Sequence, residues 1–321
     1  GLGGVHGASK DIYTSNDEYV IMTSDVTSFY PNLAIRNGWA PAHLPEEEFC
    51  EQYEWFFDER KKIPKSDPTN YVYKIVLNST YGLSNDENSF LYDPELTMRI
   101  TLNGQLSLMM LYEMICEGIP NAVPLMQNTD GLETRIPRKY VDKYMQICAE
   151  WEKITNLMLE HDTYQKVILA DVNNYIAITE GDNPSVKCKG RFVFEDLPLH
   201  KNKSFLCIRK AIYDYFVKGI EPEVSIKENK NIFDFCAGIE ANARWEYWEE
   251  HVDNGEYKKD KLQKTIRYYI SKEGSKIMKI NYLDERVSQV EAGKWLQTTF
   301  IDYVEKPFEE YDINYDYYIS K

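Results

Sequence analysis

The spacing of apolar and polar residues predicts alternating strands and helices along the first two hundred positions. Residues 18–35 start as an apolar strand that turns polar at Asp25, and Pro31 and Asn32 then interrupt the pattern. Beyond this point, apolar residues recur at helical spacing with charged residues between them. We therefore expect helices at four places, over 45–62, 71–82, 96–118 and 137–161.

Strands are expected in two further regions. "LMQNTDGLE" (125–133) has apolar residues on both sides of an Asp-Gly pair, which favours a two-residue turn and hence a β-hairpin. Residues 164–180 have the pattern of paired strands, and 185–195 continue it. After residue 200 the pattern is mixed, with helical spacing around 206–218 and 288–305. The expected fold class is α+β, with a small helical insertion and a C-terminal subdomain.

The composition indicates a globular protein. Of the 321 residues, 43% are hydrophobic and 14% are aromatic, which allows a sizeable core in two or three subdomains. The apolar runs are too short for a transmembrane helix. The N-terminal "GLGGVHGASKD" has neither Met nor a signal-peptide core, and is typical of the cut edge of a longer protein or of an added remnant. The six cysteines are scattered without a CxxC pair, which indicates free thiols in a reducing compartment.

The acidic net charge of −15 argues at first against a nucleic-acid partner. The charge is uneven, however, because residues 1–200 carry −13 and residues 201–321 carry only −2. Residues 258–279 contain eight basic and two acidic side chains. A local basic stripe of this kind can attract phosphates, since the field near a groove follows the nearby charges. A solvated surface explains the stripe equally well.

Three polar stretches carry candidate chemistry: "DVTSFYPNL" (25–33), "KIVLNSTYG" (74–82) and "NTDG" (128–131). Carboxylates at a strand end and at a hairpin tip can supply the hard oxygen ligands that Mg²⁺ prefers. In the second stretch, three polar residues are spaced i, i+4 and i+7 and so share one face of a helix. Each stretch taken alone has a plain structural alternative, namely a solvent-exposed strand end, a helix surface and a tight turn.

Together and in this order, the three stretches resemble motifs A, B and C of the polymerase region of family B DNA polymerases, and the bacteriophage enzymes most closely. Motif A, DxxSLYPS, is matched with Phe29 for Leu and Asn32 for the last Ser. Motif B, KxxxNSxYG, is matched at every fixed position. Motif C, YxDTDS, is matched more weakly, with Asn128 for its first acid and Gly131 for its Ser.

The resemblance implies a right-hand polymerase fold with an antiparallel-sheet palm, short two-helix fingers and a C-terminal thumb. The expected boundaries are 1–40 and 85–200 for the palm, 41–84 for the fingers and 201–321 for the thumb. The motifs cover roughly residues 3–195, whereas the thumb is assigned by its position and its basic stripe.

The resemblance also implies the reaction, which is template-directed DNA synthesis by phosphoryl transfer. Asp25 and Asp130 would be the catalytic carboxylates, and with the backbone carbonyl of Val26 they would hold two Mg²⁺ ions, for which Mn²⁺ can substitute. Two such ions stabilise both the attacking and the leaving oxygen. Asn128 stands in the place of the generally less essential acid, so the hairpin tip offers one carboxylate.

Five residues are expected to bind the incoming nucleotide. Lys74 would meet the triphosphate as a point charge. Asn78 and Tyr81 would line the nascent base pair, and Tyr30 would be the steric gate that excludes a 2′-hydroxyl. Arg60, at the end of the first insertion helix, would also meet the triphosphate, although a basic residue at a helix end is favoured by the dipole in any case.

DNA contacts are expected in the palm and in the thumb. "DVNNYIAI" (171–178) resembles the family's KxY segment, with Asn173 where Lys is usual, and "VKCKG" (186–190) resembles the KxKG strand that follows it. A strand surface without a DNA contact is the alternative for the KxKG strand. The implied DNA-binding residues are Tyr175, Lys187, Lys189, Lys264 and Arg267.

The expected partners are primer–template DNA and deoxynucleoside triphosphates, with no membrane. Only 24 residues precede Asp25, so a 3′–5′ exonuclease domain would be a separate or removed part. His6, in the glycine-rich "GGVHG" (3–7), is interpreted as a structural or DNA-proximal loop residue rather than as a ligand. The 49 positions from Asp25 to Lys74 leave little room for a large insertion, which favours a nucleic-acid primer over a protein primer. If phage-encoded, the protein would act in the cytoplasm of a bacterial host.

Two other functions compete with this hypothesis. The first is a catalytically weak or inactive polymerase-fold protein that binds DNA or assists replication, which the acidic balance and Asn128 favour. The second is reverse transcription or RNA synthesis. No YxDD segment occurs in the chain, and an aromatic gate at Tyr30 opposes ribonucleotides.

Overall fold

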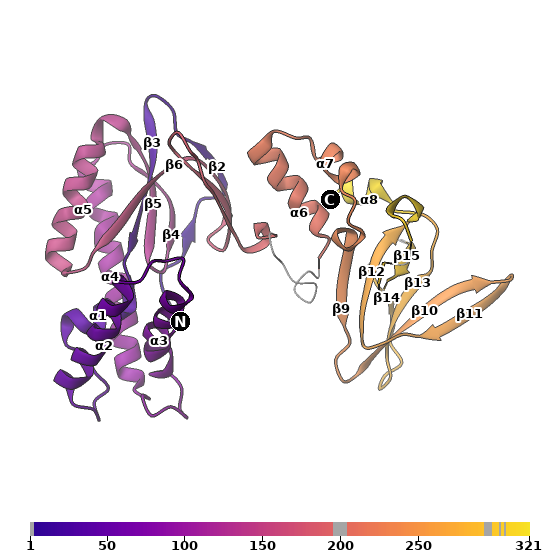
Figure 1. The fold of residues 1–321 in the computed structure, drawn as a ribbon, viewed down its shortest axis with the longest axis horizontal. Helices are drawn as coiled ribbons and strands as arrows, with labels where there is room; N and C mark the ends of the chain where they lie inside the picture. Colours follow the sequence, from indigo (N-terminus) through magenta and orange to yellow (C-terminus); the bar gives the residue numbers. More distant parts are fainter. Residues whose placement is uncertain (1–2, 195–203, 292–296, 302, 305) are drawn as a thin grey trace. The chain divides into compact units, whose positions relative to one another are not determined.

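The computed structural model describes residues 3–194, 204–291, 297–301, 303–304 and 306–321. The chain forms two compact units, Gly1–Cys188 and Lys189–Lys321, and each is described by itself (Figure 1). Both units combine helices with antiparallel sheet, so the α+β fold class is confirmed. None of the helices in the described ranges is long and apolar enough to span a bilayer.

The first unit is built on one eight-stranded sheet with the strand order β1-β4-β5-β3-β6-β7-β8, in which β2 pairs with β6. Strand β3 lies between β5 and β6 and is antiparallel to both. The strands are β1 (Gly7–Ala8), β2 (Asp11–Thr14), β3 (Tyr19–Val26), β4 (Val123–Asn128), β5 (Gly131–Pro137), β6 (Leu159–Asp171), β7 (Asn174–Thr179) and β8 (Val186–Lys189).

Five helices accompany this sheet: α1 (Phe29–Asn37), α2 (Glu46–Lys61), α3 (Pro68–Leu83), α4 (Pro94–Gly118) and α5 (Val141–Thr155), the last preceded by η1 (Arg138–Tyr140). Alternate residues of β3 divide between two cores, as the two-residue period of a strand requires. Val20 and Met22 join the large cluster formed with the helices, which includes Leu108 and Trp151. Ile21 joins a smaller cluster on the opposite face of the sheet.

The first unit agrees with most of the predicted elements. The expected helices over 45–62, 71–82 and 96–118 are confirmed as α2, α3 and α4, and the hairpin is confirmed as β4 and β5. The paired strands over 164–180 are β6 and β7, and β8 follows them. The segment 41–84, predicted as fingers, contributes Tyr53, Phe57 and Leu77 to the same core as β3.

The first unit differs from the prediction in one additional helix and one helix boundary. The strand pattern is interrupted before Pro31 and Asn32 as expected, because β3 ends at Val26, but both residues lie in the first turn of the unpredicted helix α1, where backbone N–H groups lack intrahelical acceptors and a proline is tolerated. The helix expected over 137–161 covers only Val141–Thr155. It ends because Asn156 adopts a left-handed conformation with φ 55°, and strand β6 begins soon afterwards.

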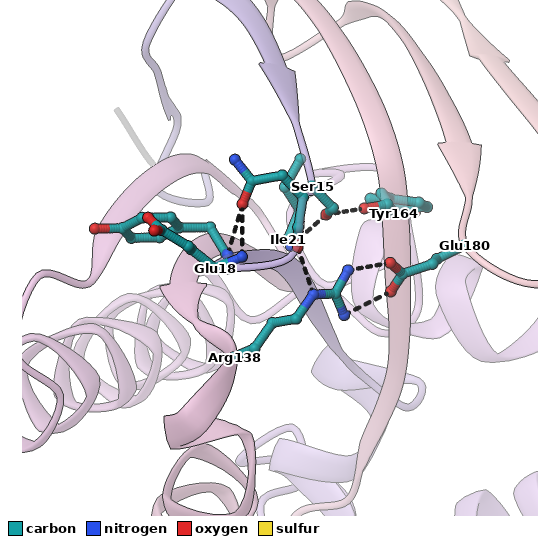
Figure 2. A network of polar contacts seen from close by, with 8 residues as sticks. Ser15, Glu18, Ile21, Arg138, Tyr164 and Glu180 are labelled. Atoms are coloured by element: carbon teal, nitrogen blue, oxygen red, sulfur yellow. Dashed lines mark hydrogen bonds and ion pairs between the residues drawn. The ribbon is translucent and has the colours of Figure 1, made fainter.

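A network of polar contacts ties together the end of the sheet where β3 begins (Figure 2). The Ser15 hydroxyl donates to the carbonyl oxygen of Tyr164 at 2.6 Å and accepts the N–H of Ile21 at 3.0 Å. The Arg138 guanidinium forms a two-pronged ion pair with Glu180. These contacts join β6, β7 and the start of β3, and they anchor the strand whose other end carries Asp25.

The second unit contains two sheets, with the strand orders β11-β10-β13-β14 and β15-β12-β9. Its strands are β9 (Cys236–Glu240), β10 (Trp245–Asp253), β11 (Glu256–Lys261), β12 (Thr265–Ser271), β13 (Lys276–Asn281), β14 (Val287–Gln289) and β15 (Gln297–Phe300). Its helices are η2 (Gly190–Phe192), α6 (Leu206–Tyr213), the π-helical η3 (Asp214–Lys218), α7 (Pro222–Glu228), η4 (Ile232–Phe235), η5 (Phe308–Glu310) and α8 (Tyr315–Ile319).

Aromatic packing explains part of the chain's high tyrosine content. Phe235, Tyr268 and Tyr318 are buried in the core of the second unit, and the ring of Phe235 meets that of Tyr318 edge-on at 5.2 Å. The expected helix over 206–218 is confirmed as α6 with η3. The helix expected over 288–305 is wrong, because its described residues include parts of β14 and β15 and contain no helix. Residues 292–296, 302 and 305 lie outside the described part of the chain.

Candidate active site

Strand pairing brings Asp25 and Asp130 to the same end of the first sheet. Asp25 faces Gly131 across β3 and β5, at the end of the β4–β5 hairpin. The N–H of Val26 donates to the backbone oxygen of Asp130 at 2.7 Å. Both carboxylates therefore come from adjacent backbone segments that are held by a hydrogen bond across the two strands.

Asp25 and Asp130 line a cavity of about 380 Å³ in the first unit. Elements far apart in the sequence contribute to it, namely β3, α1, the end of α2, α3, the hairpin tip and β6. Eight of the residues predicted for catalysis, metal binding or nucleotide binding line this cavity: Asp25, Val26, Tyr30, Arg60, Lys74, Asn78, Tyr81 and Asp130.

Two aromatic residues form one wall of the cavity. Tyr30 on α1 and Tyr81 on α3 lie with their ring centroids 4.5 Å apart at an angle of 47°. Burial, the neighbouring Tyr81 and the Asp130 carboxylate raise the pKa of Tyr30 from 10.0 to about 12. The Tyr30 phenol is therefore neutral at physiological pH and presents a rigid, uncharged ring beside Asp130.

Arg60 is held in place at the end of α2. Its Nη1 donates to the Ser28 hydroxyl at 2.9 Å, and its Nε donates to the Asn70 side-chain oxygen at 3.2 Å. Ser28 has a φ of 45°, in the left-handed region that few non-glycine residues adopt, at the turn from β3 into α1. The guanidinium thus connects this turn to the start of α3.

Lys74 and Asn78 reach the cavity from α3, which begins at a well-defined cap. The Asp67 carboxylate accepts the N–H of Thr69 at 2.8 Å, and Pro68 occupies the first helical position. Both features favour a helix start at this point. The i, i+4 spacing then places Lys74 and Asn78 on the cavity side of the helix.

Glu160 lines the same cavity and was not predicted from the sequence. It faces Asp25 across β3 and β6, and its Oε2 lies 3.1 Å from the Lys65 amine. No local pattern identifies Glu160, because its position depends on strand pairing with a residue far away in the sequence. The ion pair is exposed, so we expect it to be weak and sensitive to salt.

The N-terminal segment braces the hairpin tip. A β-carbon on Gly4 would lie 2.7 Å from the Thr129 Cα, so only glycine fits at that contact. His6 Nε2 lies 3.0 Å from the Thr129 hydroxyl. The Asn128 side-chain oxygen accepts the N–H of Thr129 at 2.9 Å. The structure thus places Gly4 and His6 against the turn that carries Asp130.

The oxygen donors at the cavity suit Mg²⁺ better than a metal ion that needs a closed set of protein ligands. Among the residues that the structure describes, no group of three or more His, Cys, Asp and Glu side chains could hold a metal ion. Asp25, Asp130 and the backbone of Val26 nevertheless line one polar cavity. Mg²⁺ keeps several waters and is commonly held by one or two carboxylates together with substrate phosphates, so an open site of this kind suits it.

Two of the predicted DNA-binding residues lie near Asp25 in the first unit. Tyr175 is only 3% exposed, and its ring packs in the smaller core. Lys187, on β8, hydrogen-bonds the Tyr175 hydroxyl. Desolvation lowers the pKa of the Lys187 amine, but Tyr164, Tyr175 and Asp25 raise it by more, so the net shift is upward. Tyr175 therefore offers almost no surface to a DNA strand.

The remaining three DNA-binding candidates belong to the second unit. Lys189 is the first residue of this unit. Lys264 is exposed, whereas the Arg267 guanidinium lies over the Phe233 ring at 5.5 Å. The basic stripe is also partly compensated, because lysines of β11 form ion pairs with acids of β10. Among them, Lys261 lies 2.5 Å from Glu246. Lys264 is therefore better exposed to a phosphate than Arg267.

Comparison with known proteins adds no family assignment. No protein-family model matches the chain, and no curated protein matches it.

Proposed function

We propose that this chain is a DNA-directed DNA polymerase of the family B type, acting as a nucleotidyltransferase on a primer–template. One observation carries the proposal. Motifs A, B and C come from three distant parts of the sequence, and their key side chains line one polar cavity of about 380 Å³. Chance motif matches would have no reason to converge in this way.

The proposed reaction transfers a nucleotidyl group. The primer 3′-hydroxyl gives up its proton to solvent water and attacks the α-phosphorus of a deoxynucleoside triphosphate, and the bond from that phosphorus to the bridging oxygen breaks to release pyrophosphate. Asp25 and Asp130, with the Val26 carbonyl, would hold two Mg²⁺ ions, which supply charge stabilisation to the attacking and leaving oxygens. The carboxylates are suited to this because both line the cavity from adjacent strands.

The other cavity residues account for nucleotide binding. Lys74 and Arg60 place positive charge where a triphosphate would lie, and Asn78 and Tyr81 border the same space. The neutral, partly buried ring of Tyr30 rests against Tyr81, so it is fixed in place as a steric gate against a 2′-hydroxyl. Contacts from Ser28 and Asn70 hold the Arg60 side chain before any ligand binds.

The partners proposed from the resemblance are primer–template DNA and deoxynucleoside triphosphates. The second unit would take the role of the thumb. Its exposed Lys264 is the best placed of the thumb candidates to meet a phosphate, and Lys187 has the corresponding role in the first unit.

The deciding experiment is primer extension by the purified chain. We expect Mg²⁺-dependent extension by the wild type and a loss of at least about a hundredfold in Asp130→Asn, because removing a group that stabilises transition-state charge commonly has an effect of this size. Binding of the primer–template should persist in the variant, measured by fluorescence anisotropy. Asp182→Asn, in an exposed loop outside the cavity, is the matched control and should extend normally.

A second candidate function is a DNA-binding accessory protein with the same fold and weak or no catalysis. The single carboxylate at the hairpin tip favours it, since Asn128 uses its side-chain oxygen to accept a backbone N–H. Primer–template binding without any Mg²⁺-dependent extension by the wild type would support this candidate and contradict the polymerase proposal.

A further inference from the structure

The space above Gly131 is occupied by the carboxylate of Asp25. The two residues face each other across β3 and β5, so a side chain at position 131 would lie on the same face of the sheet as that of Asp25. A β-carbon on Gly131 would lie 1.9 Å from Asp25 Oδ1 and 3.1 Å from its Cγ. Even alanine at position 131 is therefore incompatible with the observed orientation of Asp25.

Polar groups, both buried and exposed, surround this carboxylate. Glu133 follows Gly131 on the same face of β5, faces Thr23 of β3 and is 4% exposed. The Asp25 charge acts on the Lys187 amine and on the Tyr175 hydroxyl, and these two groups are hydrogen-bonded to each other. The Asp25 carboxylate thus occupies the space that a side chain at position 131 would fill, and its charge reaches Lys187 and Tyr175.

We propose that Gly131 is a positioning residue, whose missing side chain sets the orientation of the Asp25 carboxylate and thereby the metal affinity of the site. The inference rests on the proposed function for its link to catalysis, but the orientation itself follows from the packing. It also gives a reason for the difference from the motif C pattern, in which serine stands at this position.

The first test is a double-mutant cycle in urea on the full chain, with Gly131→Ala and Asp25→Ala. In the wild-type background, Gly131→Ala should lower the urea midpoint, because the new β-carbon displaces a carboxylate from its partners. In the Asp25→Ala background the same change should have little effect, because the colliding atoms are gone. Gly7→Ala on β1 is the control, since a β-carbon there would meet no atom within 4 Å.

The second test measures Mn²⁺ binding by electron paramagnetic resonance on folded protein without DNA or nucleotide. Gly131→Ala should bind Mn²⁺ about tenfold more weakly, the loss typical when the support of a metal ligand is changed. Gly7→Ala should bind as the wild type does. A purely structural role for Gly131 would lower stability but leave the Mn²⁺ affinity of the folded variant unchanged.

The outcomes separate this inference from the proposed function. Equal shifts of the urea midpoint in both backgrounds, or unchanged Mn²⁺ affinity in Gly131→Ala, would overturn the positioning role even if the wild type extends primers. Coupling in urea would support it even if no extension is found. If Gly131→Ala fails to fold, the Asp25→Ala/Gly131→Ala variant must fold for the inference to stand. If neither form binds Mn²⁺, the link from Gly131 to metal affinity is overturned.

Discussion

Ser24, the residue before Asp25, joins β3 to two other elements through a buried hydroxyl. Its Oγ lies 2.7 Å from the Tyr144 hydroxyl on α5 and 2.8 Å from His161 Nδ1 on β6. Burial lowers the pKa of His161 below its ordinary value of 6.5, and the Glu152 carboxylate opposes this shift only in part. Burial also raises the pKa of Tyr144, so the network behind Asp25 is neutral near pH 7.

This network predicts a loss of stability on acidification. Because the folded protein disfavours the charged ring, the unfolded chain takes up the His161 proton more readily. The contribution of neutral His161 to the unfolding free energy is therefore fully present above pH 6.5. It should be lost as the pH decreases through 6.5 towards the lower pKa of His161 in the folded state. In His161→Asn the unfolding free energy from urea titrations should depend less on pH in this window. His43→Asn, at an exposed position, should keep the wild-type slope, and equal slopes in all three proteins would contradict the assignment.

Helix α4 shows how a single element connects the parts of the first unit. At its N-terminus the Asp93 carboxylate accepts the N–H of Leu96 and the N–H of Ala42, both at 2.9 Å. Further along the helix, a β-carbon on Gly104 would lie 3.3 Å from side chains of Phe29 and Leu33, so α1 and α4 pack closely there. α1 carries Tyr30, so the helix start at Asp93 also supports the cavity wall.

Removal of this cap should destabilise the first unit. Asp93→Ala leaves the N–H groups of Leu96 and Ala42 without their acceptor, and the loss of an N-cap typically costs about 1 kcal/mol. Chemical denaturation followed by circular dichroism measures the change. Asp93→Asn keeps an oxygen acceptor at the cap and should retain most of the stability. A wild-type unfolding free energy in Asp93→Ala would show that the cap is dispensable.

At the scale of the whole molecule, the two units have separate hydrophobic cores. In the first unit, β3 contributes to both described clusters, and one of them also includes the helices around the cavity. The second unit has its own cluster, which is rich in aromatic side chains. The cavity lining comes entirely from the first unit. Each unit therefore has what a domain needs to fold independently.

We predict that residues 1–189, a length that keeps β8 complete, fold when they are expressed alone. Thermal unfolding followed by circular dichroism should be cooperative. A deoxynucleoside triphosphate with Mg²⁺ should raise the melting temperature, because a ligand that binds only the folded state stabilises it. The corresponding Lys74→Ala chain should show a smaller rise. A non-cooperative transition would mean that the second unit is needed for folding.

Local sequence signals were sufficient for the elements that depend on local physics. Helices α2, α3 and α4 and the Asp-Gly hairpin were predicted because their apolar spacing and turn residues lie within one segment. Local patterns failed where another segment decides the outcome. Within 288–305, the described residues 288–289 and 297–300 belong to strands that depend on partners elsewhere in the second unit.

The sequence by itself determined the chemistry that is available, namely the carboxylates of Asp25 and Asp130 and the polar face of α3. Only the tertiary structure decided which of these groups meet, because the strand pairings that join Asp25 to Gly131 and to Glu160 span more than a hundred residues. Such pairings depend on register and packing, which no short sequence window contains. For the same reason, the close approach of the Asp25 carboxylate to Gly131 became visible only in three dimensions.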